Sequence, residues 1–265
     1  MPLLEQDGLR ARRLRMPRTI LALMLREMAT TYGRSPGGYL WAIIDPVAAV
    51  ALLSVIFSAM FSQPAIGVNF PLFYATGYLP FMLFNDVANK MATSIRYSRP
   101  LLDYPSVTYI DALTARFLLN VLTHLMVGYL VFTGILLVFD TRAVVNLPAI
   151  LHSVTLAALL GIGIGTLNCY LMTAFPVWER AWQILTRPLF IISGIFFIFD
   201  HLPPEGQAVL WWNPVIHIVG LMRKGFYPTY DTWYVNSTYV LVIALSCLVL
   251  GLMLLRRDHR LLLES

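Results

Sequence analysis

The chain has 265 residues, of which 58% are hydrophobic and 12% are charged, and its mean hydropathy is +0.70. A soluble domain carries about 25% charged residues, so this composition excludes a soluble globular protein, a disordered chain and a collagen-like chain. The only cysteines, Cys169 and Cys247, lie in apolar runs, which argues against a disulfide scaffold and a thiolate metal site. The net charge of +5 does not indicate nucleic-acid binding, because the charges lie between the apolar runs. The chain is expected to be a polytopic membrane protein.

Six segments approach the length of about 20 mainly apolar residues that a helix needs to cross the hydrocarbon core. We therefore expect an all-α fold in which a six-span bundle occupies residues 39–255 of a single membrane domain, 1–265. The expected spans are Tyr39 to Phe61, Phe70 to Ala88, Ala112 to Phe139, Leu147 to Phe175, Trp182 to Phe199 and Tyr234 to Leu255.

The positions of lysine and arginine predict the orientation of these spans. With the N-terminus inside, sixteen of the nineteen basic residues fall on the inner side. Only Arg142, Arg223 and Lys224 fall outside. Because cytoplasmic loops of membrane proteins are enriched in Lys and Arg, both termini are expected in the cytoplasm.

An amphipathic helix is expected before the first span, within residues 10–34. From Pro17 to Thr30, the apolar residues recur on one side and the polar ones on the other, and Pro17 suits the first turn. A basic helix of this kind lies in the plane of the inner membrane interface. The alternative is a short soluble helix that packs on a partner. The residues expected on the apolar side are Ile20, Leu21, Met24, Leu25 and Met28.

The fifth span and the segment after it depart from a plain six-helix pattern. Arg187-Pro188 is expected to break the span, which leaves Leu189 to Phe199 too short to cross the membrane. Prolines, two tryptophans and a second apolar run follow within residues 200–230. We expect re-entrant short helices here, at the outer face, surrounded by protein. The alternative is a loop whose tryptophans lie in the interfacial aromatic belt.

Motifs for chemistry are absent from the sequence. Gly33 and Gly38 have the spacing of a phosphate-binding loop, but Tyr39 and Leu40 follow where Lys and Ser or Thr are required. No pair of histidines has metal-ligand spacing. Asp45 and His124 are the ionisable residues deepest in the spans, and a side chain hydrogen-bonded between helices is the simpler interpretation of each. The chain is therefore expected not to be an enzyme, and to hold no metal or cofactor.

The fourth expected span contains Gly161, Gly163 and Gly165. Small residues four apart allow two helices to approach closely in a membrane. This spacing predicts tight packing, either within the chain or between subunits.

Two sets of residues resemble a known family. The segment 25–35, LREMATTYGRS, with 38–42, GYLWA, and Asp45-Pro46, resembles the N-terminal signature of type-2 ABC exporter membrane subunits. More narrowly it resembles the permease of capsular-polysaccharide exporters. The later run 193–197, SGIFF, with 213–218, NPVIHI, and Arg223, is similar to the fifth-span and re-entrant segment of the same family. In this order, the motifs and the six-span pattern cover essentially the whole chain.

The resemblance implies a permease subunit that forms a homodimer and works with two copies of a separate ABC ATPase subunit. ATP and Mg would be bound by that ATPase. The complex would move a lipid-linked polysaccharide outward across the bacterial inner membrane, and periplasmic adaptor proteins are further candidate partners. The cytoplasmic loop 96–111 would couple to the ATPase, with a helix expected to start at Ser98; a solvated turn is the alternative. The candidate coupling residues are Arg99, Leu101, Leu102, Asp103 and Tyr104.

Candidate substrate contacts follow from the chemistry of a sugar polymer. Unpaired hydroxyl groups are costly in hydrocarbon, so the polymer needs a channel lined by hydrogen-bonding and aromatic groups. Capsular polymers of this class are commonly acidic, and arginines bind anions by charge-assisted hydrogen bonds. The topology rule alone also places arginines at the inner face, whereas Arg223 and Lys224 violate it and are expected to guide polymer at the outer mouth. The candidates are Arg26, Tyr32, Arg34, Tyr39, Trp41, Arg96, Arg99, Arg223 and Lys224.

Three other functions remain open from the sequence. A related permease for O-antigen or teichoic-acid-type polymer would share these features, because nothing in the sequence identifies the sugar. A membrane-embedded lipid-modifying enzyme would need converging buried His, Asp or Glu residues, and none were found. A channel or secondary transporter is disfavoured because the two halves show no internal repeat.

Overall fold

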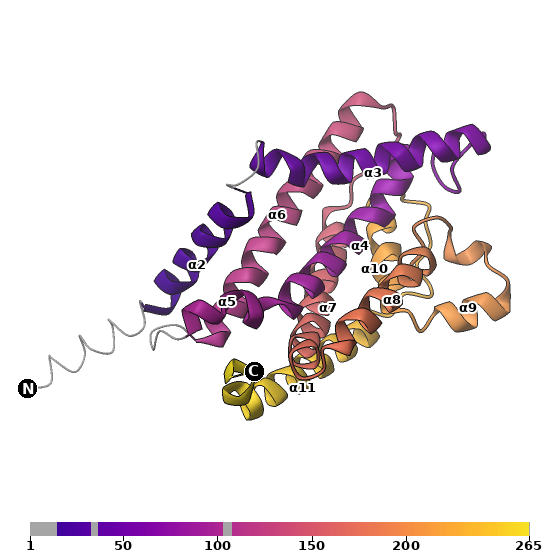
Figure 1. Ribbon diagram of the computed structural model, residues 1–265. Helices are drawn as coiled ribbons and strands as arrows, with labels where there is room; N and C mark the ends of the chain where they lie inside the picture. Colours follow the sequence, from indigo (N-terminus) through magenta and orange to yellow (C-terminus); the bar gives the residue numbers. More distant parts are fainter. Residues whose placement is uncertain (1–14, 33–36, 103–107, 265) are drawn as a thin grey trace, which may run out of the picture.

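The computed structural model describes residues 15–32, 37–102 and 108–264, and helices are the only regular secondary structure in these ranges. Figure 1 shows a bundle in which α2, α5 and the C-terminal end of α11 lie at one end. The helices are α2 (Arg15–Tyr32), α3 (Gly38–Met60), α4 (Phe70–Ala92), α5 (Ser94–Leu102), α6 (Tyr109–Val138), α7 (Leu147–Ala174), α8 (Val177–Ile192), η1 (Phe199–His201), α9 (Pro204–Leu210), α10 (Pro214–Lys224) and α11 (Ser237–Glu264).

Four helices in the described chain are long and apolar enough to cross a membrane: Leu40–Met60, Tyr109–Val138, Leu147–Ala174 and Ser237–Arg257. They belong to α3, α6, α7 and α11 and match four of the expected spans. The second expected span is also a helix, α4, which is deeply buried between its neighbours but less apolar.

The centre of the fold is α7, which packs between α4 and α11. Its glycines allow this contact. A Cβ atom at Gly161 would meet Val87 of α4, and one at Gly165 would meet Met91 of the same helix. A Cβ atom at Gly163 would overlap the backbone carbonyl of Ala244 in α11. The glycine pattern therefore serves packing within the chain, one of the two alternatives that the sequence left open.

The expected break at Arg187-Pro188 is wrong. Helix α8 runs through Pro188, which costs one backbone hydrogen bond, and it ends at Ile192. The chain turns instead at Gly194, whose φ of 79° is accessible to glycine without strain. The expected span Trp182 to Phe199 is thus a helix of 16 residues that begins earlier, at Val177.

The segments at the two ends of the bundle are also helical. At one end, α5 starts at Ser94 and not at the expected Ser98, because it follows α4 after the single residue Thr93. At the other end, residues 200–230 contain the two short helices α9 and α10. Helix α10 is almost wholly buried and packs on α4 and α7.

Candidate functional site: the polar cluster at the α2–α5 end

Helix α2 packs on α6 through a buried ion pair. The Nε atom of Arg116 donates to Oε1 of Glu27 at 2.8 Å, and both side chains are at most 7% exposed. Meanwhile Leu21 and Leu25 of α2 are more than half exposed. The exposed leucines are compatible with an apolar side that faces a membrane interface, whereas Glu27, expected on the polar side, is turned toward the bundle and pairs with Arg116.

The guanidinium of Arg116 also holds the end of α4. One of its terminal nitrogens donates to the carbonyl of Lys90 at 3.0 Å and to Oγ1 of Thr93 at 3.3 Å. The carbonyls in the last turn of a helix lack partners within the helix, so a cation is favourable there. Arg116 thereby joins α2, α4 and α6.

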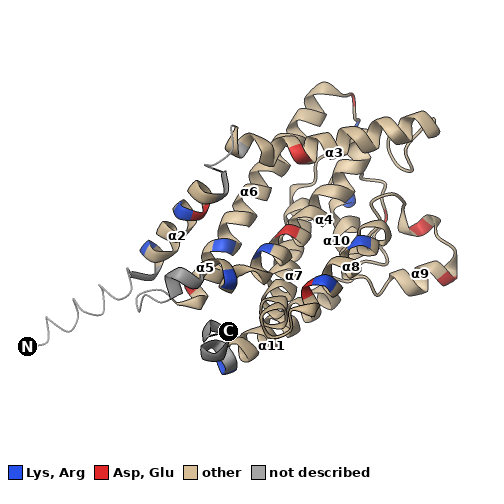
Figure 2. Ribbon diagram, viewed as in Figure 1, with Lys and Arg blue, Asp and Glu red and all other residues tan. Residues whose placement is uncertain are grey.

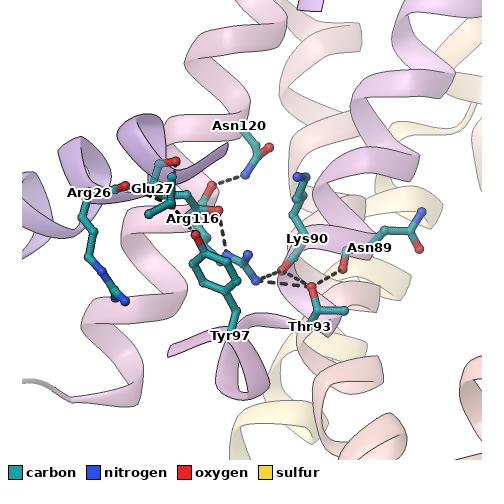
Figure 3. A network of polar contacts seen from close by, with 9 residues as sticks. Arg26, Glu27, Asn89, Lys90, Thr93, Tyr97, Arg116 and Asn120 are labelled. Carbon is teal, nitrogen blue, oxygen red and sulfur yellow. Dashed lines mark hydrogen bonds and ion pairs between the residues drawn. The ribbon is translucent and has the colours of Figure 1, made fainter. Parts of the chain in front are cut away.

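Helix α5 is attached to the same cation. Arg116 lies over the ring of Tyr97, 4.2 Å from its centroid, and the hydroxyl of Tyr97 hydrogen-bonds to Thr30 of α2. Figure 3 shows Glu27, Lys90, Thr93 and Tyr97 around Arg116. A desolvated cation–π contact is worth about 2 kcal/mol. One residue therefore fixes α2, α4, α5 and α6 to one another.

Helix α8 is attached to this end by two further contacts. The indole nitrogen of Trp182 donates to Asn89 of α4 at 2.9 Å. Arg96 of α5 forms an exposed ion pair with Glu179 at 3.0 Å. An exposed pair adds little stability, so the Trp182 contact is the stronger link.

The candidate substrate residues at this end are not gathered into one pocket. The side chain of Arg26 is exposed and extends away from Arg116 (Figure 3). Arg96 is exposed and pairs with Glu179, and Trp41 is 51% exposed near the start of α3. Tyr32, Tyr39 and Arg99 lie in α2, α3 and α5, but the structure does not describe their side chains; Arg34 lies outside the described residues.

The candidate coupling residues are described only in part. Leu101 and Leu102 form the last turn of α5, and the structure does not describe their side chains. Asp103 and Tyr104 lie outside the described residues. Helix α6 then begins with a capping box between Thr108 and Asp111, which fixes where the loop returns to the bundle.

Arg223 at the opposite end is placed differently from expectation. The expectation of an accessible cation at the outer mouth is not met, because Arg223 is 1% exposed. Its guanidinium donates to the carbonyl of Phe197 at 2.7 Å and to that of Ile195 at 3.3 Å. It also lies over the ring of Phe73. Lys224 is exposed and donates to Thr232, so it is the surface cation of the pair.

The family-like motifs 193–197 and 213–218 form buried scaffolding beside Arg223. Asn213 caps α10 by accepting from the backbone of Val215 at 3.0 Å. The same side chain donates to Ser193 and to the carbonyl of Ile192, at the end of α8. His217 is fully buried, and both of its ring nitrogens have backbone partners. These residues hold the turn after α8 against α10.

Sequence reasoning missed the most connected residue, Arg116, and its partner Glu27. By its position in the sequence, Arg116 lies near the end of the expected span Ala112 to Phe139, and Glu27 falls on the polar side of the amphipathic helix. An unpaired charge in an apolar span was the available signal. Within the described ranges, no three His, Cys, Asp or Glu residues lie close enough to hold a metal ion. The arrangement ties α2, α4, α5 and α6 to one another.

The chain is similar to known proteins over most of its length. The chain is 31% identical over 247 residues to the polysialic acid transport protein KpsM of Escherichia coli, covering 93% of this chain and 96% of that protein. It is 28% identical to the capsule polysaccharide export inner-membrane protein BexB of Haemophilus influenzae, over 90% of each chain. It is 26% identical to the corresponding protein CtrC of Neisseria meningitidis serogroup A, over 91% of each. Residues 18–227 match the family model described as ABC-2 type transporter, and the chain therefore belongs to the ABC-2 type transporter family.

Proposed function

We propose that this chain is the permease subunit of an ATP-driven exporter of capsular polysaccharide in the bacterial inner membrane. The observation that carries the proposal is the similarity to a polysialic acid transport protein, which extends over 93% of this chain and 96% of that protein. Two capsule polysaccharide export proteins from other bacteria are similar over 90% or more of the chain. The substrate is a lipid-linked polymer, and the acidic character of polysialic acid favours an acidic one.

The proposed topology has six spans, formed by α3, α4, α6, α7, α8 and α11, with both termini in the cytoplasm. Most of the basic residues in the described chain lie at the bundle end that contains α2, α5 and the end of α11 (Figure 2). This asymmetry supports a cytoplasmic location for that end. Helices α9 and α10 then lie at the periplasmic face, where the burial of α10 satisfies the requirement for a re-entrant segment.

The permease acts as a homodimer with two copies of an ABC ATPase, which binds ATP and Mg. Exposed surfaces of α3 and α8 support the dimer. No residue of α8 is buried in the single chain. Its exposed residues include the polar Gln183 and Arg187. Polar side chains at membrane depth are unfavourable against lipid, so a second copy or a wet corridor is required beside them. Leu52, Val55 and Met60 expose a broad apolar surface on α3.

The cytoplasmic cluster supports a role for residues 96–111 in coupling to the ATPase. Helix α5 rests on Arg116 through Tyr97, and Arg116 holds α2 and α4. A displacement of α5 would therefore be transmitted to α2, α4 and α6 through these direct contacts. The polymer contacts proposed at this face remain Arg26, Tyr32, Arg34, Tyr39, Trp41, Arg96 and Arg99. Lys224 takes the outer position alone, where periplasmic adaptor proteins also dock.

Deletion of the gene in its own bacterium tests the function. We expect surface polymer to disappear and lipid-linked polymer to accumulate inside the cell, and a plasmid copy to restore export. A plasmid copy together with an ATPase whose phosphate-binding lysine is changed should restore nothing. Unchanged surface polymer after deletion would refute the proposal, and loss of a different surface glycan would identify another polymer.

A further inference from the structure

The described helices α2–α8 contain one acidic side chain that the single chain leaves unpaired. Asp45 of α3 is exposed and has no ion-pair or hydrogen-bond partner among the described residues. It lies seven residues after the first residue of α3, about 10 Å into a helix long enough to span the membrane. The other acidic residues of these helices are engaged: Glu27 with Arg116, Asp86 with His124, Glu179 with Arg96, and Asp111 in the cap of α6. A carboxylate at membrane depth is unfavourable against hydrocarbon, so Asp45 needs a partner from outside the chain.

Helix α8 carries a cation in the same condition. Arg187 is exposed, and it too lacks an ion-pair or hydrogen-bond partner in the part of the chain that the structure describes. It lies ten residues after the first residue of α8, about 15 Å along the helix. The buried arginines Arg116 and Arg223 differ, because both donate to backbone carbonyls. Arg187 is thus a cation at membrane depth whose partner must also come from outside the chain.

Apolar side chains surround both charges. On α3, Trp41 precedes Asp45 by about one turn and is 51% exposed. On α8, Ile184 and Ile191 lie about one turn on either side of Arg187, and they are 67% and 59% exposed. Residues three and four apart lie on the same face of a helix. Each charge therefore lies within an exposed apolar face, where lipid cannot neutralise it and a protein surface of opposite charge can.

Contacts with α4 establish the level of Asp45 in the bundle. The ring of Phe57 in α3 lies 5.2 Å from the ring of Tyr74 in α4. Asp45 lies twelve residues before Phe57, and α3 and α4 run in opposite directions, so the matching position in α4 is twelve residues after Tyr74, at residue 86. The tilt of α3 against α4 (Figure 1) shortens this distance along α4. Asp45 therefore lies at about the level of residues 82–86 of α4.

Helix α8 places Arg187 at the same level. The ring of Phe190 lies 5.3 Å from the ring of Phe81 in α4, and Trp182 donates to Asn89 of α4. Arg187 lies between these two contacts, three residues from Phe190 and five from Trp182, which corresponds to about residue 84 of α4. The two unpaired charges thus lie within about one helical turn of the same depth.

We propose that these charges pair across the homodimer, so that Asp45 of each copy binds Arg187 of the partner subunit. The inference rests on the homodimer proposed above. A two-fold axis along the membrane normal leaves depth unchanged, so side chains meet across it only if they lie at similar levels, and the contact then occurs twice. An acidic polymer would neutralise Arg187 but repel Asp45, whereas a second copy supplies both charges. The pair holds α3 of one copy against α8 of the other.

Charge reversal in two co-expressed copies tests the pair. Full-length copies with different affinity tags are extracted in detergent, and the amount of one copy that copurifies with the other is measured. When both copies carry Arg187→Glu, or both carry Asp45→Arg, like charges meet at both contacts, and we expect copurification to fall by at least about tenfold. When one copy carries Arg187→Glu and the other Asp45→Arg, opposite charges meet at both contacts. We then expect copurification within about twofold of the wild type.

The mixed experiment distinguishes a contact between copies from a contact within one copy. If Asp45 paired with Arg187 of its own chain, each copy in the mixture would hold two like charges, and copurification would stay low. Arg180→Glu is the matched control, because it makes the same charge change about two turns earlier on the exposed side of α8. Alone it should leave copurification unchanged. Combined with Asp45→Arg in the other copy, it should leave copurification below that of the wild type.

Cross-linking provides a second measurement if the charge-reversed chains do not fold. Both copies first receive Cys169→Ala and Cys247→Ala, which remove the native thiols. One copy then carries Asp45→Cys and the other Arg187→Cys. A short bifunctional thiol reagent should join them into a product with both tags, and Arg180→Cys in place of Arg187→Cys should lower the yield about tenfold. No cross-linked product, although each cysteine reacts with a maleimide, would overturn the proposal.

Failure of the ion pair and failure of the proposed homodimer give different results. Wild-type copies that do not copurify would refute both the homodimer and the pair. Wild-type copies that copurify, together with a mixture of the two reversed copies that does not recover, would overturn the pair alone. None of these measurements needs polymer or ATPase, so they do not depend on which substrate the protein moves.

Discussion

Replacement of Arg223 by methionine separates a structural role from a substrate contact. Methionine keeps much of the length of the arginine side chain but cannot donate hydrogen bonds to the carbonyls of Phe197 and Ile195. Both carbonyls lie in the turn after α8, which has no regular helix or strand to supply other partners. We therefore expect the turn to loosen from α10. Lys224→Met is the matched control, because Lys224 is exposed next to it.

The expected loss of stability follows from these contacts. A hydrogen bond from a charged donor contributes about 1.5–3 kcal/mol, and two are lost. The cation–π contact with Phe73 adds up to about 2 kcal/mol. The cost of burying the guanidinium offsets part of this sum, by several kcal/mol. We expect a net destabilisation of about 3 kcal/mol for Arg223→Met, and at most about 0.5 kcal/mol for Lys224→Met.

Thermal unfolding of the purified protein in detergent measures this difference. We expect Arg223→Met to lower the melting temperature by on the order of 10 °C and Lys224→Met to leave it near that of the wild type. Surface polymer should fall with protein abundance for Arg223→Met. For Lys224→Met it should fall without loss of abundance. The reasoning is refuted if Arg223→Met melts like the wild type and yet abolishes export, because Arg223 would then contact substrate.

Three further outcomes are expected. Glu27→Gln or Arg116→Met alone should destabilise the protein by about 3–5 kcal/mol, and the double variant should lose less than the sum of the two. A double-mutant cycle of unfolding free energies measures this. Additive losses would contradict a direct pair. Gly163→Ala should cost about 1–3 kcal/mol, because its Cβ atom would overlap backbone, whereas Gly134→Ala should be neutral or stabilising; equal melting temperatures would refute the packing argument. Burial raises the pKa of the Tyr230 hydroxyl, so above about pH 10 the unfolded chain ionises before the folded one and the free energy of unfolding falls, whereas below that pH it is retained. Tyr230→Phe should lessen this alkaline loss of the free energy of unfolding. An unchanged dependence of unfolding on pH would contradict the reasoning.

The helices themselves follow from local sequence. Long apolar runs predicted α3, α6, α7 and the apolar part of α11 within a few residues, because each contains enough apolar residues to form a span, whereas α11 itself continues to Glu264. The apolar residues before the first span recur on one face of a helix and the polar ones on the other, and this pattern predicted α2. Glycine spacing predicted the close packing on α7, although only the structure shows that α4 and α11 are the partners.

The errors arise where a distant partner decides the outcome. Glu27 and Arg116 are 89 residues apart, and neither position alone indicates that the two pair inside the fold. The rule that basic residues gather at the cytoplasmic face identified Arg223 as an exception but said nothing about its burial. The end of α8 is set by the turn at Gly194, which requires a positive φ, whereas the helix tolerates Pro188.

Transport in proteoliposomes tests the central claim most directly. The chain is purified with its ABC ATPase, reconstituted in vesicles, and supplied with lipid-linked capsular polymer on the side of the ATPase. We expect polymer to become protected inside the vesicles only when ATP and Mg are present and both proteins are included. Protection without ATP, or ATP hydrolysis that moves no polymer in the intact complex, would contradict the account.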